Sequence, residues 1–329
     1  MENYFFQVPS PGRAMTTSMV AGAAGFLGSH LSRTLIAQGH SVIGVDNLAS
    51  STGENLSELL RSGSFEFHER SVSSMRLSDF NQKIDYVFHF ASPASPSNYQ
   101  QLGLETIHAN TVGTENLIRL ALANSSRFLF ASTSEIYGDP LISPQTEEYW
   151  GNVNPIGPRS VYDESKRLGE TLVSHFARER NLDGSIIRIF NTYGPGMDAL
   201  DGRVVSTFIR QALLGQPFTV FGDGTQTRSF CYVDDLVSGL VKMAESSEFG
   251  PVNLGNPAEI DLITLGRVVA QTLGVPLRFE HLPLPQDDPK QRRPEISLAK
   301  RSLAWEPTVT LEEGIRKTAN WMRGSLGIG

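Results

Sequence analysis

The sequence is poor in cysteine and contains no long apolar run. Cys231 is its only cysteine, so no intrachain disulfide can form, and we expect a reducing, cytoplasmic setting. The apolar stretches fall short of the roughly 20 residues that a helix needs to cross a bilayer. The segment from Met1 to Thr16 has neither an apolar run nor a cationic flank. We therefore expect a flexible N-terminal extension, not a signal peptide, and no membrane partner.

The sequence also has no excess of positive charge. It contains 28 Lys and Arg residues against 35 Asp and Glu residues, which makes it mildly acidic. It therefore lacks the basic surface through which proteins bind nucleic acid, and we expect no nucleic-acid partner. An anionic small molecule would need a local group of basic side chains. At 329 residues, the chain is long enough for one large domain that carries a smaller lobe.

Strand patterns alternate with helix patterns through the first half of the chain. We expect strands at residues 18–20, 41–45, 85–90, 127–131 and 185–190, and helices at residues 26–38, 104–124 and 161–179. This alternation predicts parallel strands with helices on both faces of the sheet.

Three glycines follow the first expected strand and open the first expected helix. Gly22 permits a tight turn, Gly25 lets the backbone approach a diphosphate, and Gly28 allows close contact between helix and strand. The N-terminus of the helix, at Phe26 and Leu27, offers unpaired N–H groups to the same diphosphate. Alone, such a pattern could be an ordinary tight turn, but here it lies between a strand and a helix.

An acidic residue, Asp46, ends the second expected strand. It would accept hydrogen bonds from the ribose hydroxyls of a dinucleotide, although it could instead merely cap a turn. No Arg or Lys lies between Val45 and Leu60, and Glu54 adds negative charge. A 2′-phosphate would be repelled, so the sequence predicts NAD and not NADP as the cofactor.

The composition changes after Asn191, where glycine and proline become denser and residues 283–294 form a polar, proline-rich loop. We predict an α/β fold, a Rossmann-type doubly wound parallel sheet with a smaller C-terminal substrate-binding lobe. The expected parts are an extension at 1–16, a mainly NAD-binding domain at 17–190 and a mainly substrate-binding lobe at 191–329. Some strands and helices of the last part would return to the main domain. No metal site is expected.

A tyrosine and a lysine lie one helical turn apart on the same expected helix face. Tyr162 and Lys166 are spaced so that an ammonium can favour the ionised form of a phenol that normally titrates near 10. Such a pair alone could be a surface coincidence. It follows, however, by one strand–helix unit the segment Thr133–Glu135, whose side chains would point into the crevice beyond the carboxyl ends of the strands. Thr133 and Ser134 could also satisfy loop backbone groups, an alternative that stays more open for Ser134.

The combination of Gly22–Gly28, Thr133, Tyr162 and Lys166 resembles the extended short-chain dehydrogenase/reductase family. Longer segments resemble UDP-glucuronate decarboxylases within that family, namely residues 90–96, 132–140, 149–151, 154–159, 188–195, 201–206 and 226–230. The similarity runs from about Thr17 to about Arg323, which is nearly the whole chain.

The resemblance implies a sequence of steps on a UDP-sugar: NAD-dependent oxidation of C4, loss of the C5 carboxylate as CO2, and re-reduction of C4 to give UDP-xylose. Tyr162 would remove the C4 hydroxyl proton, Lys166 would hold the ribose and lower the tyrosine pKa, and Thr133 would hydrogen-bond the reacting oxygen. Ser134 stands where 4,6-dehydratases carry an acid, and Glu135 is usually absent from 4-epimerases. Both are candidates for positioning the water or proton used at C5.

The resemblance also implies binding contacts. For the cofactor, these would come additionally from Asn47, Phe90, Ala91 and Arg203, the last meeting an anionic group of cofactor or substrate. For the substrate, they would come from Asn191 and Arg228 at the diphosphate, Arg292 near the uridine, Tyr99 in the sugar pocket, and His108 near the substrate. His108 replaces a lysine of the family, and Gly196 replaces an arginine.

Three other interpretations stay open at this point. The chain could be a 4-epimerase, a decarboxylase that releases the UDP-4-keto-pentose, or a non-catalytic NAD-binding regulator. The helices expected at 104–124 and 161–179 resemble those that pair subunits of this family through a four-helix interface, which implies a homodimer.

Overall fold

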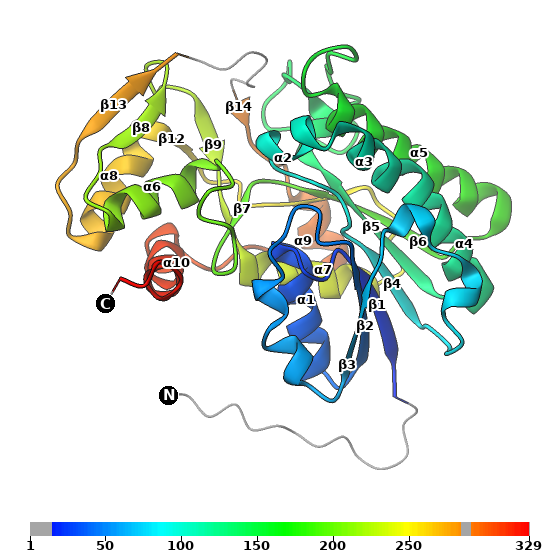
Figure 1. The fold of residues 1–329 in the computed structure, drawn as a ribbon. Coiled ribbons are helices and arrows are strands. Elements are labelled where there is room, and N and C mark those ends of the chain that lie inside the picture. The colour runs from blue at the N-terminus through cyan, green and yellow to red at the C-terminus, as the bar shows by residue number, and fades with distance from the viewer. Residues whose placement is uncertain (1–14, 284–290, 329) are drawn as a thin grey trace.

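The computed structural model describes residues 15–283 and 291–328 of the chain. Most of the expected N-terminal extension (1–16), and residues 284–290 of the expected proline-rich loop, lie outside the described residues. Figure 1 shows a layered α/β body beside a smaller lobe.

Seven parallel strands form the main sheet, in the order β11-β6-β5-β4-β1-β2-β3. Their bounds are β1 Thr17–Ala21, β2 Ser41–Asp46, β3 Phe65–Glu69, β4 Tyr86–His89, β5 Arg127–Thr133, β6 Gly184–Ile189 and β11 Val252–Leu254. The strand order reverses between β1 and β4, which places a topological switch point at the centre of the sheet. The predicted Rossmann-type sheet is thereby confirmed, and β11 returns to it from the C-terminal part.

Helices cover both faces of this sheet (Figure 1). One face carries α1 Phe26–Ala37 and α7 Val233–Glu245, with α9 Ser297–Leu303 packed on α7. The other carries α4 Thr114–Asn124 and α5 Ser160–Arg180, with α2 Pro96–Gln101 and α3 Gly103–His108 packed beside α5.

The lobe contains three helices in mutual contact and several short strands. Its helices are α6 Val204–Leu213, α8 Leu262–Leu273 and α10 Leu311–Leu326. Its strands are β7 Thr192–Tyr193 with β10 Cys231–Tyr232, β8 Phe218–Phe221 with β13 Phe279–Leu282, and β12 Glu259–Asp261, β9 Thr227–Ser229 and β14 Gln291–Arg292 as a three-stranded sheet. None of the described helices is long and apolar enough to cross a membrane.

The helix expected at 104–124 is interrupted in the structure. A π-helical turn, Ala109–Gly113, separates α3 from α4. It turns the buried Asn110 toward α5, where its amide donates to Ser165 Oγ at 3.0 Å. Gly113 packs so closely on Val72 that a Cβ would lie 2.5 Å from that side chain. These tertiary contacts, which apolar periodicity does not encode, explain the irregular turn.

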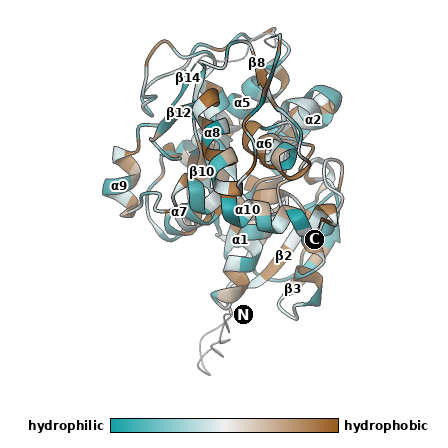
Figure 2. Cartoon of the chain, turned by 90° about the vertical axis from the view of Figure 1, so that its left-hand side faces the viewer, coloured by the Kyte–Doolittle hydropathy of each residue, from teal (hydrophilic) through white to brown (hydrophobic). Residues whose placement is uncertain are grey.

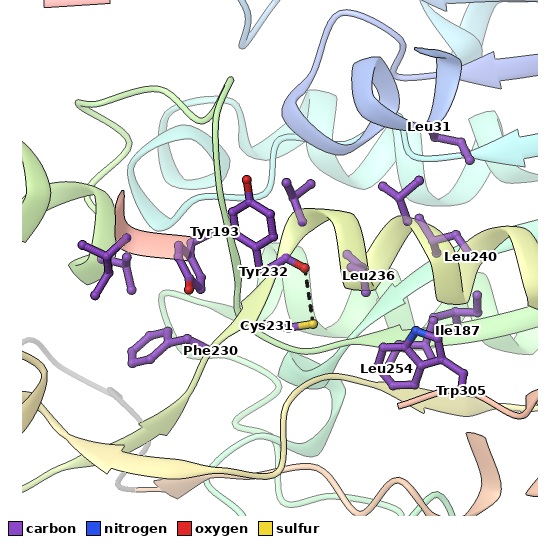
Figure 3. Close-up of a cluster of buried hydrophobic side chains, with 14 of the residues drawn as sticks. Leu31, Ile187, Tyr193, Phe230, Cys231, Tyr232, Leu236, Leu240, Leu254 and Trp305 are labelled. Carbon is purple, nitrogen blue, oxygen red and sulfur yellow. Dashed lines mark hydrogen bonds between the residues drawn. The ribbon is translucent and has the colours of Figure 1, made fainter. Parts of the chain in front are cut away.

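The largest core cluster lies between the sheet and its α1/α7 face and continues into the lobe. Figure 3 shows Leu31 of α1 and Leu236 and Leu240 of α7 converging near Ile187 and Trp305. The helices in Figure 2 carry both hydrophilic and hydrophobic residues, as expected when one face packs and the other meets water.

Candidate active site

The turn after β1 lies at the switch point of the sheet and is pressed against the chain that leaves β4. Gly22 has φ +89°, and a Cβ there would lie 2.7 Å from the carbonyl carbon of Phe90 and 2.8 Å from the amide of Ala91. A Cβ at Gly28 would lie 2.0 Å from the oxygen of Gly22. Side chains at these two glycines would therefore displace backbone, which explains the residue choice.

The N-terminus of α1 opens directly from this turn. Gly25 is the N-cap residue, no side chain caps the helix, and no acidic residue lies in its first turn. The amides of the first turn, including those of Phe26 and Leu27, are thus suited to the diphosphate of a dinucleotide.

Asp46 ends β2 beside the same turn. Its carboxylate accepts hydrogen bonds from Ala24 N at 3.0 Å and Leu48 N at 2.9 Å. Burial raises the pKa of Asp46, while the hydrogen bonds from Leu48, Ala24 and Asn47 oppose that shift. The side chain of Asn47 is turned to its own loop, where Oδ1 accepts from Ala49 N. The glycine turn, the uncapped helix and this carboxylate together fit NAD.

The predicted Tyr–Lys pair lies buried on α5, against the end of β5. Tyr162 is 7% exposed and Lys166 is 2% exposed. The Nζ of Lys166 donates to the carbonyl of Ala131 at 2.7 Å and lies 5.8 Å from the centre of the Tyr162 ring. Thr133 ends β5, and its hydroxyl accepts from Glu135 N at 3.2 Å. The sequence-predicted trio of Thr133, Tyr162 and Lys166 is therefore brought together.

The expected lowering of the Tyr162 pKa by Lys166 is not what the structure gives. Burial raises the pKa of Tyr162, while a hydrogen bond from Thr133 and the charge of Arg203 oppose that shift. Burial also lowers the pKa of Lys166 to about 7, with Glu170 opposing. Desolvation dominates because both groups lie between α5 and the sheet, away from water.

Glu135 lies between two arginines just beyond β5. Its carboxylate is 2.7 Å from Nη2 of Arg159 and 3.3 Å from Nη1 of Arg292. Burial alone would raise the pKa of Glu135, but Arg292 and Arg159 outweigh it and lower the pKa to about 2. Glu135 is therefore a carboxylate at neutral pH, able to accept a proton or a hydrogen bond but unable to supply a proton.

Arg292 lies elsewhere than expected. We expected it near the uridine, but it is 2% exposed and lies against Ser134 and Glu135. Its Nη1 donates to Ser134 Oγ at 3.1 Å, and its Nη2 donates to the carbonyl of Gly138 at 3.1 Å. Strand β14 is the cause, since it pairs with β9 and sets Arg292 beside Arg228. Arg228 is also close enough to help lower the Glu135 pKa.

Tyr99, expected in the sugar pocket, stacks on Tyr162. The ring centroids are 5.1 Å apart and the ring planes differ by 6°. The Tyr99 hydroxyl is buried and has no hydrogen-bond partner among the described residues. A buried hydroxyl of this kind calls for a polar partner, and a sugar can provide one.

The remaining predicted residues, Arg203, Asn191 and His108, differ in their contacts with the Tyr162 site. Arg203 precedes α6, pairs with Asp201 at 3.1 Å, and is near enough to influence Tyr162. Asn191 follows β6, and its carbonyl accepts from Cys231 N at 2.9 Å. His108 ends α3 as an exposed residue, and no hydrogen bond or ion pair among the described residues joins its side chain to the other predicted residues. Its role near the substrate stays a prediction.

Two residues of the site, the half-buried Arg159 and the buried Asp163, were missing from the sequence-based set. Arg159 pairs with Glu135, and Asp163 lies next to the same charges with one carboxylate oxygen unpartnered among the described residues. Burial and the charge of Glu135 raise the pKa of Asp163 to about 7. The sequence did contain a signal for Arg159: it precedes Tyr162 by three residues, and so it lies one helical turn before that residue.

A doubly wound sheet with this turn and a buried Tyr–Lys pair defines a dinucleotide-dependent enzyme of the dehydrogenase type. The chain belongs to the NAD dependent epimerase/dehydratase family, whose sequence model matches residues 18–255. NAD is accordingly its cofactor.

Two relatives of this chain are UDP-glucuronic acid decarboxylases. The chain is 46% identical to UDP-glucuronic acid decarboxylase 1 of Xenopus tropicalis, over 94% of this chain and 72% of that protein. It is 48% identical to UDP-glucuronic acid decarboxylase 4 of Arabidopsis thaliana, over 92% of this chain and 68% of that protein. Among solved structures, UDP-glucuronic acid 4-epimerase of Bacillus cereus, in complex with UDP-glucuronic acid and NAD, superposes with a TM-score of 0.84 at 27% identity, covering 94% of this chain and 100% of that one.

Proposed function

We propose that this protein is a UDP-glucuronate decarboxylase that forms UDP-xylose and CO2. The observation that carries the proposal is the buried cluster of Ser134, Glu135 and Arg292 directly beside Thr133 and Tyr162. The named relatives, 46% and 48% identical over more than nine-tenths of the chain, are decarboxylases of this substrate. The earlier prediction of a decarboxylase agrees with these relatives.

The first chemical task of the protein is to remove the proton of the sugar C4 hydroxyl. When bound, NAD accepts a hydride from a sugar carbon and later returns it. Tyr162 takes the hydroxyl proton, and Thr133 hydrogen-bonds the same oxygen. Lys166, fixed by the carbonyl of Ala131, lies beside the phenol, where its protonated form would favour the ionised tyrosine.

The second task is to stabilise charge while the carboxylate leaves. A ketone at C4 makes the C5 carboxylate part of a β-keto acid, so the electrons of the broken C–C bond delocalise into the carbonyl. Protonated Tyr162 and Thr133 donate hydrogen bonds to the resulting enolate oxygen, as an oxyanion hole does. The proton then delivered to C5 comes from a group or water positioned by Ser134 and Glu135, since Glu135 itself is ionised.

Binding of the nucleotide sugar needs local positive charge in an acidic protein. Arg228 and Asn191 hold the diphosphate, because the planar guanidinium of arginine suits paired phosphate oxygens. Tyr99 offers its unpartnered hydroxyl to the sugar. Arg292 acts at the carboxylate end of the sugar and not at the uridine, because it contacts Ser134 and Glu135.

An assay with UDP-glucuronate tests the proposed function. NAD-loaded protein should yield UDP-xylose and one CO2 per sugar, and deuterium placed at C4 should stay in the product. Tyr162→Phe should lower turnover by about 100-fold or more, because it removes the general base. Epimerised sugar without CO2 would identify a 4-epimerase, whereas binding of NAD without any turnover would identify a regulator. Unchanged turnover in Tyr162→Phe would contradict the mechanism.

We further propose that the protein acts as a homodimer. Three apolar side chains of the α3–α5 face are exposed: Leu104 at 69%, Val112 at 44% and Leu168 at 47%. Val161 of α5 lies against Gly103 of α3, and Leu168 follows it by two helical turns on the same side of α5. Exposed apolar residues that lie together in this way favour a partner surface.

A further inference from the structure

A short segment that enters the lobe is tied back to the glycine turn. Residues 194–197 follow β7, and the buried Met197 accepts a hydrogen bond from Ser206 of α6. At the other end, a Cβ at Gly194 would lie 3.6 Å from the ring of Phe26, the first residue of α1. The segment thus lies between the lobe and the end of α1 that is suited to the cofactor diphosphate.

Two polar side chains join this segment to the dinucleotide-binding elements. The Nε2 of His30, one turn along α1 from Phe26, is 2.7 Å from the carbonyl of Pro195. The Nδ2 of Asn55 donates to the carbonyl of Gly196 at 3.0 Å and to that of Ala24, within the glycine turn, at 3.4 Å. One amide group therefore bridges the turn and the segment.

The contact with Asn55 depends on the glycine at position 196. Gly196 has φ +83°, and a Cβ there would lie 3.0 Å from Oδ1 of Asn55. The absence of a side chain lets Asn55 approach the backbone closely. Asn55 is itself held by Arg33 of α1, whose Nη2 donates to the Asn55 carbonyl at 3.0 Å. His30 and Asn55 take no other part in the proposed reaction.

We propose that His30 and Asn55 form a latch that keeps residues 194–197 closed over the glycine turn and so retains the cofactor between the two hydride transfers. The effect of this latch on the sugar product rests on the proposed function. If the reduced cofactor left before the hydride returned, UDP-glucuronate and NAD⁺ would become the UDP-4-keto-pentose, CO2 and NADH. The latch therefore determines whether the sugar leaves as the pentose or as its ketone.

Two substitutions open the latch from different sides. Asn55→Ala removes both amide hydrogen bonds, and His30→Phe keeps an aromatic ring beside Phe26 but removes the N–H donor. Glu58→Gln is the matched control, because it removes only the charge from the exposed 3.0 Å pair between Glu58 and Arg33, and it alters neither residues 194–197 nor the hydrogen bond from Arg33 to the Asn55 carbonyl. Thermal unfolding of each variant checks that it is folded.

The readout is cofactor dissociation, which is independent of decarboxylation. Protein loaded with labelled NAD or NADH is mixed with excess unlabelled cofactor, and the bound label is followed over time. Each latch variant loses one hydrogen bond to residues 194–197 and should therefore release NADH about tenfold faster, while Glu58→Gln should match the unsubstituted protein. The variants should also release more UDP-4-keto-pentose per CO2. Dissociation rates equal to that of Glu58→Gln would overturn the latch, whereas absence of CO2 from the unsubstituted protein would overturn only the proposed function.

Discussion

The pKa values of two carboxyl groups within one charge cluster are shifted in opposite directions. Arg292 and Arg159 outweigh burial at Glu135 and lower its pKa to about 2. Burial and the neighbouring charge of Glu135 raise the pKa of Asp163 to about 7. Divergent pKa values of this kind separate an acceptor role from a proton-holding role. Near neutral pH, Asp163 is therefore the carboxyl group of this cluster whose charge changes.

Lys166 offers a test of burial at the single-residue level. Its pKa falls from 10.5 to about 7 because burial disfavours the charged form. A folded-state pKa below the unfolded value means that protonation favours unfolding. The destabilisation is full below pH 7 and disappears as the pH approaches 10.5. Lys166→Met should therefore abolish turnover yet raise the free energy of unfolding by about 2–4 kcal/mol at pH 7.

Urea unfolding at several pH values between 7 and 10.5 measures this effect. The difference between Lys166→Met and the unsubstituted protein should shrink steadily across that range. Lys83→Met, at an exposed lysine, should show no such trend. A difference that stays constant with pH would mean that burial of the ammonium is not its cause.

At the scale of elements, the distance between α5 and β5 positions the Tyr–Lys pair. Gly169 lies within α5, and a Cβ there would be 2.3 Å from Cζ of the fully buried Phe130. Gly169→Ala should push α5 from the sheet and carry Tyr162 and Lys166 with it. We expect a loss of about 1–3 kcal/mol in stability. We also expect kcat to fall more than KM rises, because Arg228 and Asn191 lie on other elements.

Steady-state kinetics and urea unfolding of Gly169→Ala check both effects. Thr171→Ala, at an exposed position of the same helix, is the control and should change neither quantity greatly. If Gly169→Ala lost stability but kept its kcat, the register between α5 and β5 would not control the chemistry.

Sequence patterns predicted those parts of the site whose residues lie close together along the chain. The glycine turn between β1 and α1, and the tyrosine and lysine on one face of α5, depend on residues a few positions apart. Such spacing fixes relative position once the strand or helix forms. Five of the seven strands of the parallel sheet followed from the same kind of pattern, whereas β3 and β11 were not among the expected strands.

Contacts between distant segments could not be predicted in this way. Arg292 reaches Ser134 across 158 positions, because β14 pairs with β9 in the lobe. The interrupted helix depends on Asn110 and Gly113 packing against other elements. His108, which the resemblance assigned to the substrate, lies exposed at the end of α3, and its role stays a prediction.

At the scale of the whole molecule, the proposed dimer would cover the face built by α3, the π-helical turn and α5. A stable interface buries roughly 1,200–2,000 Å² in total, and charged residues are depleted from its core. Glutamates at Leu104 and Leu168 would place charge at the centre of this face. The double variant L104E/L168E should therefore sediment as a monomer, while the unsubstituted protein sediments as a dimer at micromolar concentration.

The control for this experiment is Leu277→Glu, which adds the same charge at a leucine of the lobe that is 41% exposed. It should leave the dimer intact, because the lobe lies away from the α3–α5 face (Figure 1). A monomeric unsubstituted protein, or dissociation by L277E as readily as by L104E/L168E, would contradict this interface. Tyr99 of α2 and Tyr162 of α5 stack on each other within the layer of helices that the dimer would cover. Dissociation of the dimer should therefore also lower turnover. Full turnover by the monomer would mean that the active site does not depend on the dimer.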